Sequence, residues 1–208
     1  MRGLENIPWL YDACCAISEL GGFSRWRDWL VKGARGRTLE VGCGTGRNLP
    51  RYAADLAPVA LEPDPLAILR ARRRGPRALL VRASAEALPF RDGAFDTVVA
   101  SLVFCSVPDA ARGLAEVRRV LGSAGRLRML EHVRSTSRWV GRWQDLVQPA
   151  WTWVAGGCHP NRRTEAAVER AGFAIEPEGR RSRGTMRRFS ARPAASERAP
   201  RPADGAPH

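Results

Sequence analysis

Three alternating glycines near the start of the chain have the spacing of a backbone loop that wraps around a ligand. Gly42, Gly44 and Gly46 follow the apolar segment Thr38–Val41 directly. Glycine tolerates positive φ angles and lets a ligand approach the backbone closely. Glu62 comes about 20 residues later, at the end of a second apolar segment, where a carboxylate can accept hydrogen bonds from both hydroxyls of a ribose. Loop and carboxylate together predict a cofactor that contains a ribose.

The position of the third glycine argues against a dinucleotide as the cofactor. A dinucleotide-binding loop has the pattern G-x-G-x-x-G, but the position two beyond Thr45 is occupied by Arg47. A nucleotide-dependent oxidoreductase is therefore the less favoured enzyme class. The alternative to a cofactor-binding loop is a turn with a purely structural role.

The elements that must position these residues alternate between strands and helices. Strands are predicted at Thr38–Val41, Pro58–Glu62, Ala78–Val81, Thr97–Val103, Arg126–Glu131, Phe173–Glu176 and Met186–Arg192. Helices are predicted within Trp9–Val31, at Arg47–Ala54, at Pro65–Arg74 with Leu66, Ile68 and Leu69 inward, after Asp109, at Trp139–Val154 and at Thr164–Ala171. The order predicts an α/β Rossmann-like fold, with a mostly parallel sheet, helices on both faces, and ligands at the carboxyl ends of the strands.

From about Leu39 to Arg192 the chain resembles the class I S-adenosyl-L-methionine-dependent methyltransferases. The resemblance rests on Glu40–Gly46, on Glu62, on the segment 83–90 and on Phe95–Val99. It implies a seven-stranded sheet, an N-terminal helical lid, and S-adenosyl-L-methionine as the cofactor. The implied cofactor-binding residues are Glu40, Gly42, Cys43, Gly44, Gly46, Asn48, Glu62, Pro63, Ser84, Ala85, Glu86, Ser101 and Val103. Ser84 stands where the family commonly has an aspartate, so Ser84 or the backbone is expected to hold the adenine amino group.

A narrower resemblance lies in the segment 101–107, in Glu131-His132-Val133, in 149–151 and in Gly157-Cys158. These residues are similar to the methyltransferase-like thiol S-methyltransferases and to bacterial relatives, some of them labelled phospholipid methyltransferases. The resemblance implies methyl transfer to a small-molecule acceptor such as a thiol, with Glu131 and His132 as candidate catalytic residues. His132 would help to form the thiolate, because a free thiol has a pKa of about 8.5. A structural histidine at a strand end is the alternative for His132.

Two further functional alternatives stay open. One is a methyltransferase that acts on a phospholipid or on another amine or hydroxyl group. The other is a non-catalytic module that keeps the cofactor loop and binds nucleic acid. The formal charge of +13 suits nucleic acid or an anionic membrane surface. However, only Lys32 among the 34 basic residues is a lysine, and the arginines run through every segment, which is typical of a GC-rich coding bias. We therefore expect no dedicated nucleic-acid partner and do not predict peripheral membrane contact.

Length and composition predict one domain in a reducing, cytoplasmic setting. No window approaches the run of about 18 apolar residues that spans a bilayer, and the first ten residues lack a signal-peptide pattern. We expect a helical lid at 1–36, the methyltransferase domain at 37–192, and a disordered tail at 193–208.

Cysteines and tryptophans are the remaining candidates for chemistry. The five cysteines are Cys14, Cys15, Cys43, Cys105 and Cys158; without any C-x-x-C pair they predict free thiols and no metal site. The spacing of Cys105 and Cys158 gives no support for a shared metalloid site. Four tryptophans, at 139, 143, 151 and 153, suit a helix that packs into the core, with the roof of an acceptor pocket as the alternative.

Overall fold

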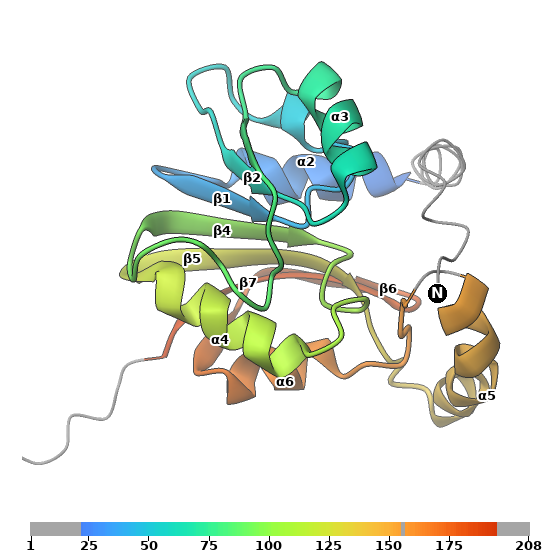
Figure 1. The fold of residues 1–208 in the computed structure, drawn as a ribbon. Coiled ribbons are helices and arrows are strands. Elements are labelled where there is room, and N and C mark those ends of the chain that lie inside the picture. Colours follow the sequence, from blue (N-terminus) through green and yellow to red (C-terminus); the bar gives the residue numbers. More distant parts are fainter. Residues whose placement is uncertain (1–21, 155–156, 195–208) are drawn as a thin grey trace, which may run out of the picture.

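A computed structural model describes residues 22–154 and 157–194 and shows one sheet covered by helices on both faces (Figure 1). The strands are β1 (Thr38–Val41), β2 (Val59–Leu61), β3 (Leu79–Val81), β4 (Phe95–Ser101), β5 (Leu121–His132), β6 (Phe173–Arg183) and β7 (Met186–Pro193). Their order in the sheet is β3-β2-β1-β4-β5-β7-β6, with β7 antiparallel to both of its neighbours and the other pairings parallel. This confirms the predicted α/β fold with a mostly parallel seven-stranded sheet.

The helices divide between the two faces of the sheet. They are α2 (Ser24–Lys32), the 3-10 helix η3 (Leu49–Arg51), α3 (Pro65–Arg74), α4 (Ala110–Val120), α5 (Arg138–Val154) and α6 (Thr164–Arg170). In Figure 1, α2 and α3 lie on one side of the sheet and α4 and α6 on the other, while α5 lies beyond the sheet's end. Asp64 and Asp109 cap α3 and α4 by accepting hydrogen bonds from the backbone N–H of Leu66 and of Arg112.

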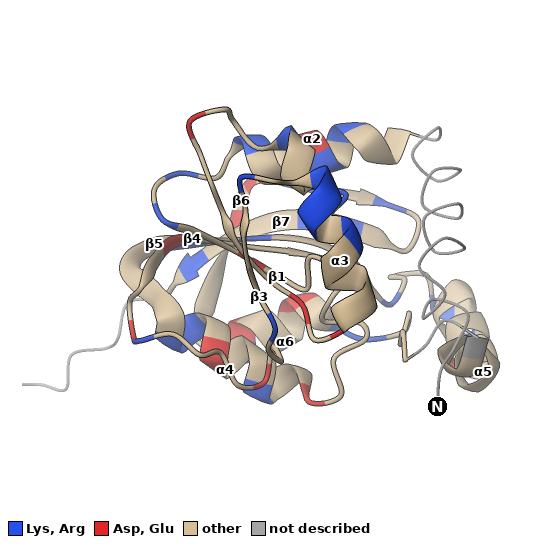
Figure 2. Ribbon diagram, turned by 45° about the horizontal axis from the view of Figure 1, so that its top comes forward, with Lys and Arg blue, Asp and Glu red and all other residues tan. Residues whose placement is uncertain are grey.

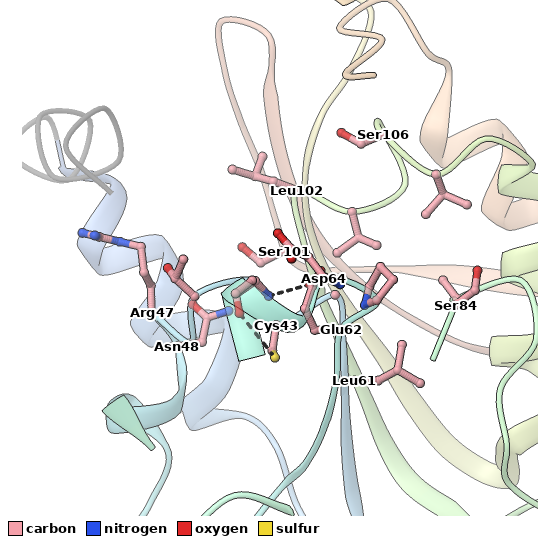
Figure 3. A pocket seen from close by; sticks show the side chains of 18 of the residues that line it. Cys43, Arg47, Asn48, Leu61, Glu62, Asp64, Ser84, Ser101, Leu102 and Ser106 are labelled. Carbon is pink, nitrogen blue, oxygen red and sulfur yellow. Dashed lines mark hydrogen bonds between the residues drawn. The ribbon is translucent and has the colours of Figure 1, made fainter. Parts of the chain in front are cut away.

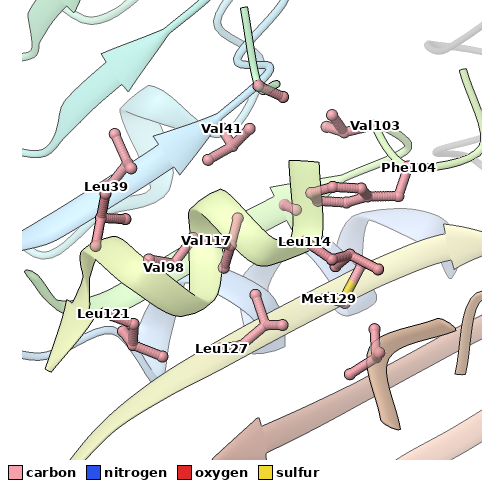
Figure 4. Packing of buried hydrophobic residues seen from close by; sticks show 14 of the residues in the cluster. Leu39, Val41, Val98, Val103, Phe104, Leu114, Val117, Leu121, Leu127 and Met129 are labelled. Carbon is pink, nitrogen blue, oxygen red and sulfur yellow. The ribbon is translucent and has the colours of Figure 1, made fainter. Parts of the chain in front are cut away.

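Two hydrophobic clusters fix the sheet between these layers. Val98 packs with the α4 side chains Leu114 and Val117 on one face (Figure 4), whereas its neighbour Val99 packs with Leu30 of α2 on the other face. Successive residues of a strand point to opposite faces, so a central strand that is apolar at every position contributes to both clusters.

The inner face of α3 differs from the prediction. Leu66 and Leu69 are each 57% exposed, and the buried side chains of this helix are Ala67 and Ala71. The cause is the close approach of the glycine loop, because a Cβ placed on Gly46 would lie 2.7 Å from the Cα of Ala71. Only small side chains fit at that distance, and the leucines are turned outward.

The tryptophans of α5 also differ from the core interpretation. Trp139, Trp143, Trp151 and Trp153 are between 45% and 74% exposed. No described helix is long and apolar enough to cross a membrane.

Element boundaries differ in several places. The helix predicted at Arg47–Ala54 shrinks to η3, and β6 extends to Arg183. β4 runs from Phe95 to Ser101 instead of Thr97 to Val103, and β5 begins at Leu121 instead of Arg126. Leu102 has a φ of 59°, which turns the chain out of the sheet. The first half of the predicted lid helices and the tail beyond Ala194 lie outside the described residues.

Candidate functional site

A cavity of about 320 Å³ lies at the carboxyl ends of β1, β2 and β4 (Figure 3). This is the point at which the strand order reverses, since β1 pairs with β2 on one side and with β4 on the other. The lining comes from four segments, namely 42–48, 61–67, 84–85 and 101–108, together with Arg27 of α2.

The three glycines of the loop differ in what surrounds their Cα atoms. Gly42 has a φ of 63°, and a Cβ there would lie 2.6 Å from a methyl group of Val103. Gly44 has a φ of 54°, and a Cβ there would meet nothing within 4 Å, so its backbone is open towards the cavity. Gly46, with a φ of 81°, gives the close packing of α3. The loop thus combines two packing glycines with one that leaves room for a ligand.

Glu62 closes the far side of the loop at the end of β2. One of its carboxylate oxygens accepts the N–H of Gly44 at 2.9 Å, and the other accepts the N–H of Asp64 at 3.0 Å. Burial raises the pKa of this carboxyl above its usual range, and the two backbone donors oppose that shift. Each oxygen keeps a free lone pair, so the carboxylate can still accept ribose hydroxyls.

A chain of buried polar side chains supports the loop from behind. Asn48 donates to Glu40 at 2.8 Å, and Arg27 donates to Asn48 at 2.8 Å and to Ser101 at 3.3 Å. Burial raises the pKa of Glu40 to about 7, against the hydrogen bond from Asn48, which lowers it. Glu40 therefore acts on the cavity through Asn48 and does not line it.

Glu131 supports the loop after β4, which forms the wall of the cavity opposite Glu62. It is fully buried at the end of β5, and its oxygens accept the backbone N–H groups of Val103, Phe104 and Cys105 at 3.0, 3.0 and 3.3 Å. Burial raises the pKa of this carboxyl to about 7, while the three donors lower it. The contacts make Glu131 a positioning residue for the loop 103–105.

His132 lies behind this loop and is partly buried. Its Nδ1 is 3.9 Å from Sγ of Cys158, and it does not line the cavity. Cys43, Cys105 and Cys158 are free thiols, as predicted; Cys14 and Cys15 lie outside the described residues.

Most of the predicted cofactor residues meet in the cavity. Its lining includes Gly42, Cys43, Gly44, Asn48, Glu62, Pro63, Ser84, Ala85, Ser101 and Val103. Glu40, Gly46 and Glu86 lie outside it. Glu86 instead accepts the N–H of Asp109 at 2.6 Å, which ties the Ser84 loop to the start of α4.

Sequence reasoning missed several lining residues. They include Arg27, Thr45, Arg47, Asp64, Leu102, Ser106, Val107 and Pro108. Asp64 was recognisable from its position two residues after Glu62, as was the run Ser106–Pro108 from its continuity with the segment 101–105. Arg27 carried no signal, because only the packing of α2 brings it to the site.

The lining residues suit S-adenosylmethionine. The open backbone at Gly44 and the carboxylate of Glu62 lie together where a ribose would be held. Leu61, Ala85 and Val103 provide apolar surface for a base. Arg27, Asn48 and Ser101 offer polar atoms on the other side. The cavity lies within the size range of small-molecule sites.

Comparisons with known proteins agree with this geometry. The family model "Methyltransferase domain" matches residues 39–129. The human protein Thiol S-methyltransferase TMT1A is 34% identical over 178 residues, which is 82% of this chain and 73% of that protein. Demethylmenaquinone methyltransferase of Thermus thermophilus is 37% identical over 133 residues, or 58% of this chain and 60% of that protein. Among solved structures, a SAM-dependent methyltransferase of Thermotoga maritima superposes with a TM-score of 0.63 at 20% identity, covering 83% of this chain and 95% of that one.

Proposed function

The chain belongs to the S-adenosylmethionine-dependent methyltransferases, and we propose that its acceptor is a small, uncharged thiol. The observation that carries the proposal is the extent of the likeness to the human thiol S-methyltransferase. An aligned span of 82% of 208 residues must include everything from the glycine loop through Cys158. The likeness therefore includes the wall formed by 101–108 as well as the cofactor loop.

The charge distribution of the cavity also favours an uncharged acceptor. Its two lining carboxylates, Glu62 and Asp64, both follow β2, on the side assigned to the ribose. The wall at 101–108 presents Leu102, Val103, Val107 and Pro108 with two serine hydroxyls and no acidic side chain. A protonated amine at this wall would lose its hydration without gaining a charged partner, which is costly.

The chemistry needs alignment and the loss of one proton. When bound, S-adenosylmethionine would supply a methyl group already activated on a sulfonium; its transfer to the acceptor sulfur would break the methyl–sulfonium bond, and the thiol proton would be released. Val103, whose N–H is held by Glu131, lines the cavity and would help to align the acceptor, which needs a near-attack distance of about 3–3.5 Å. We assign His132 to assisting the removal of the thiol proton.

The N-terminal region belongs to the same site in this proposal. Arg27 brings α2 to the cavity, and we propose that residues 1–36 act as a lid over the cofactor. Deleting Met1–Gly22 should abolish turnover while the sheet still folds, as measured by methyl transfer and by circular dichroism. Full activity of the shortened protein would argue against a lid.

A matched set of acceptors tests the substrate class. Three compounds with the same alkyl group carry –SH, –OH or –NH₂, and each is incubated with the protein and with cofactor labelled in its methyl group. We expect label in the thioether alone. Label in the amine, or in phospholipid or a demethylated quinone offered in parallel while the thiol stays unlabelled, would overturn the thiol assignment.

The three free thiols also fit a reducing environment, and we propose the cytoplasm as the place of action. A small-molecule acceptor needs no nucleic-acid partner. Basic residues occur on helices and strands on both sides of the sheet (Figure 2), with a run at Arg72–Arg74 at the end of α3. Several of them pair with carboxylates, such as Arg119 with Glu116 and Arg180 with Glu165.

A further inference from the structure

Three side chains from distant parts of the sequence converge beside the loop 101–108. Cys105, His132 and Cys158 each offer one ligand atom, and these atoms all lie within 4.8 Å of one another. Both cysteines are buried and the histidine is partly buried. Sequence spacing gave no sign of this meeting, and only the fold brings Cys105 and Cys158 together.

Hydrogen bonds fix the backbone around the two cysteines of the cluster. Cys105 donates its N–H to Glu131 and accepts the N–H of His159 at 2.7 Å. The carbonyl of Cys158 accepts the hydroxyl of Thr152 at 3.1 Å. A group fixed in this way needs little ordering when a ligand binds.

The chemistry of the donors selects the ion. Two sulfurs and one imidazole nitrogen suit Zn²⁺, whereas Mg²⁺ and Ca²⁺ require oxygen ligands. Zinc bonds of about 2.3 Å to sulfur and about 2.0–2.1 Å to nitrogen place tetrahedral ligands roughly 3.5–3.8 Å apart. The 3.9 Å between Cys158 Sγ and His132 Nδ1 is close to that value. Glu131 does not compete, because its oxygens are engaged by backbone donors.

We propose that Cys105, His132 and Cys158 bind Zn²⁺ through three protein ligands and that the fourth position of the ion takes the sulfur of the acceptor thiol. Three protein ligands with one open position is the arrangement of catalytic zinc sites. None of the three ligand residues lines the cofactor cavity, but the loop that carries Cys105 does so through its neighbour Ser106, so the ion would lie directly behind this wall of the cavity.

This inference rests on the proposed thiol acceptor and gives His132 a more specific task. Coordination deprotonates a thiol at neutral pH, with the proton released to solvent and no oxidant required. His132 would then assist as a ligand of the ion and not as the group that takes the proton. In this proposal the chain has a metal site, which the sequence did not indicate.

Metal content tests the site without relying on activity. The full-length protein, purified under reducing conditions and reloaded with Zn²⁺ after chelation, should hold about one zinc per chain by mass spectrometry of the elements. Cys105→Ser, Cys158→Ser and His132→Ala should each weaken zinc binding by more than about 100-fold. Cys43→Ser and His159→Gln are matched controls that should keep the zinc. Cys158→His, which retains a ligand atom, should bind more tightly than Cys158→Ser.

Cobalt tests the open position. Co²⁺ in the same site should give a sulfur-to-metal absorption band that shifts when the acceptor thiol is added without cofactor.

The outcomes separate the metal site from the proposed function. If the protein holds no stoichiometric zinc, or if Cys158→Ser binds zinc as tightly as the wild type, there is no such site. If the absorption band does not shift when the thiol is added, the acceptor sulfur does not bind the metal. Thiol methylation by metal-free protein would overturn the zinc proposal and leave the proposed function standing. Metal binding without thiol methylation would overturn the thiol acceptor and its place on the ion, and would leave only the three-ligand metal site standing.

Discussion

Replacing Glu62 by glutamine separates the charge of this residue from its shape. In the structure both carboxylate oxygens accept backbone N–H groups, from Gly44 at 2.9 Å and from Asp64 at 3.0 Å. An amide keeps one oxygen acceptor, so its NH₂ group must face one of those two donors. The charged acceptor for the ribose hydroxyls is lost at the same time.

These losses set the expected magnitude. A hydrogen bond to a charged group is worth about 1.5–3 kcal/mol, and an unsatisfied buried donor costs about 1–3 kcal/mol. Part of the second cost is already present before the cofactor binds, because Gly44 and Asp64 meet Glu62 in the free protein. We therefore expect binding to weaken by about 1–3 kcal/mol, which raises Kd about 5- to 150-fold.

Calorimetric titration with S-adenosylmethionine and with its demethylated product measures this change. Because burial raises the pKa of Glu62, wild-type affinity should fall as pH falls through that pKa, and Glu62→Gln should lack this pH dependence. Asp96→Asn is the control, since Asp96 also accepts a backbone N–H, from Arg37 at 2.8 Å, but near the opposite, amino end of β4. It should change Kd by less than about twofold. A folded Glu62→Gln protein with wild-type affinity would refute the ribose assignment.

Three further predictions follow from single contacts. The folded pKa of Glu40 is about 7 against an ordinary 4.5, so the free energy of unfolding should fall by up to about 3 kcal/mol as pH rises between these values, and denaturant titration of Glu40→Gln should show a flatter profile. Gly46→Ala should cost about 1–3 kcal/mol of stability by collision with Ala71, visible as a lower Tm, whereas Gly44→Ala should mainly weaken cofactor binding; equal Tm losses would contradict this. His132→Ala should lower turnover on a thiol by about 10²–10⁴-fold at pH 7, with the gap narrowing above about pH 8.5 as the thiol ionises unaided, and an undiminished rate at pH 7 would remove His132 from the mechanism.

The sequence predicted best what depends on neighbours in the chain. β1 and α3 have the predicted bounds, Thr38–Val41 and Pro65–Arg74, because apolar runs, a capping aspartate and a first-turn proline act locally. The inward face of α3 was missed because it depends on how closely Gly46 approaches, which is a tertiary effect. The exposed tryptophans of α5 were missed for a related reason, since helical spacing indicates an apolar face but not whether another layer covers it.

The candidate site shows the same division. Gly42, Gly44 and Glu62 were predictable because a loop after a strand and a carboxylate at the end of the next strand meet in any parallel sheet. Arg27 and the cluster of Cys105, His132 and Cys158 were not, since their approach depends on the packing of α2 and on the hydrogen bonds of the loop that follows β4.

Two fully buried carboxylates support two different loops of the cavity. Glu40 in β1 supports the glycine-loop side through Asn48, whereas Glu131 in β5 fixes the loop after β4 through the N–H groups of Val103, Phe104 and Cys105. Burial disfavours the charged form of both carboxyls and raises each pKa to about 7. Each carboxylate therefore costs stability at its position, and the hydrogen bonds that it accepts offset part of this cost. The two sides are nevertheless in contact, because Arg27 joins Asn48 to Ser101 and Gly42 packs against Val103, so a change in the loop 101–108 should also be felt by the glycine loop.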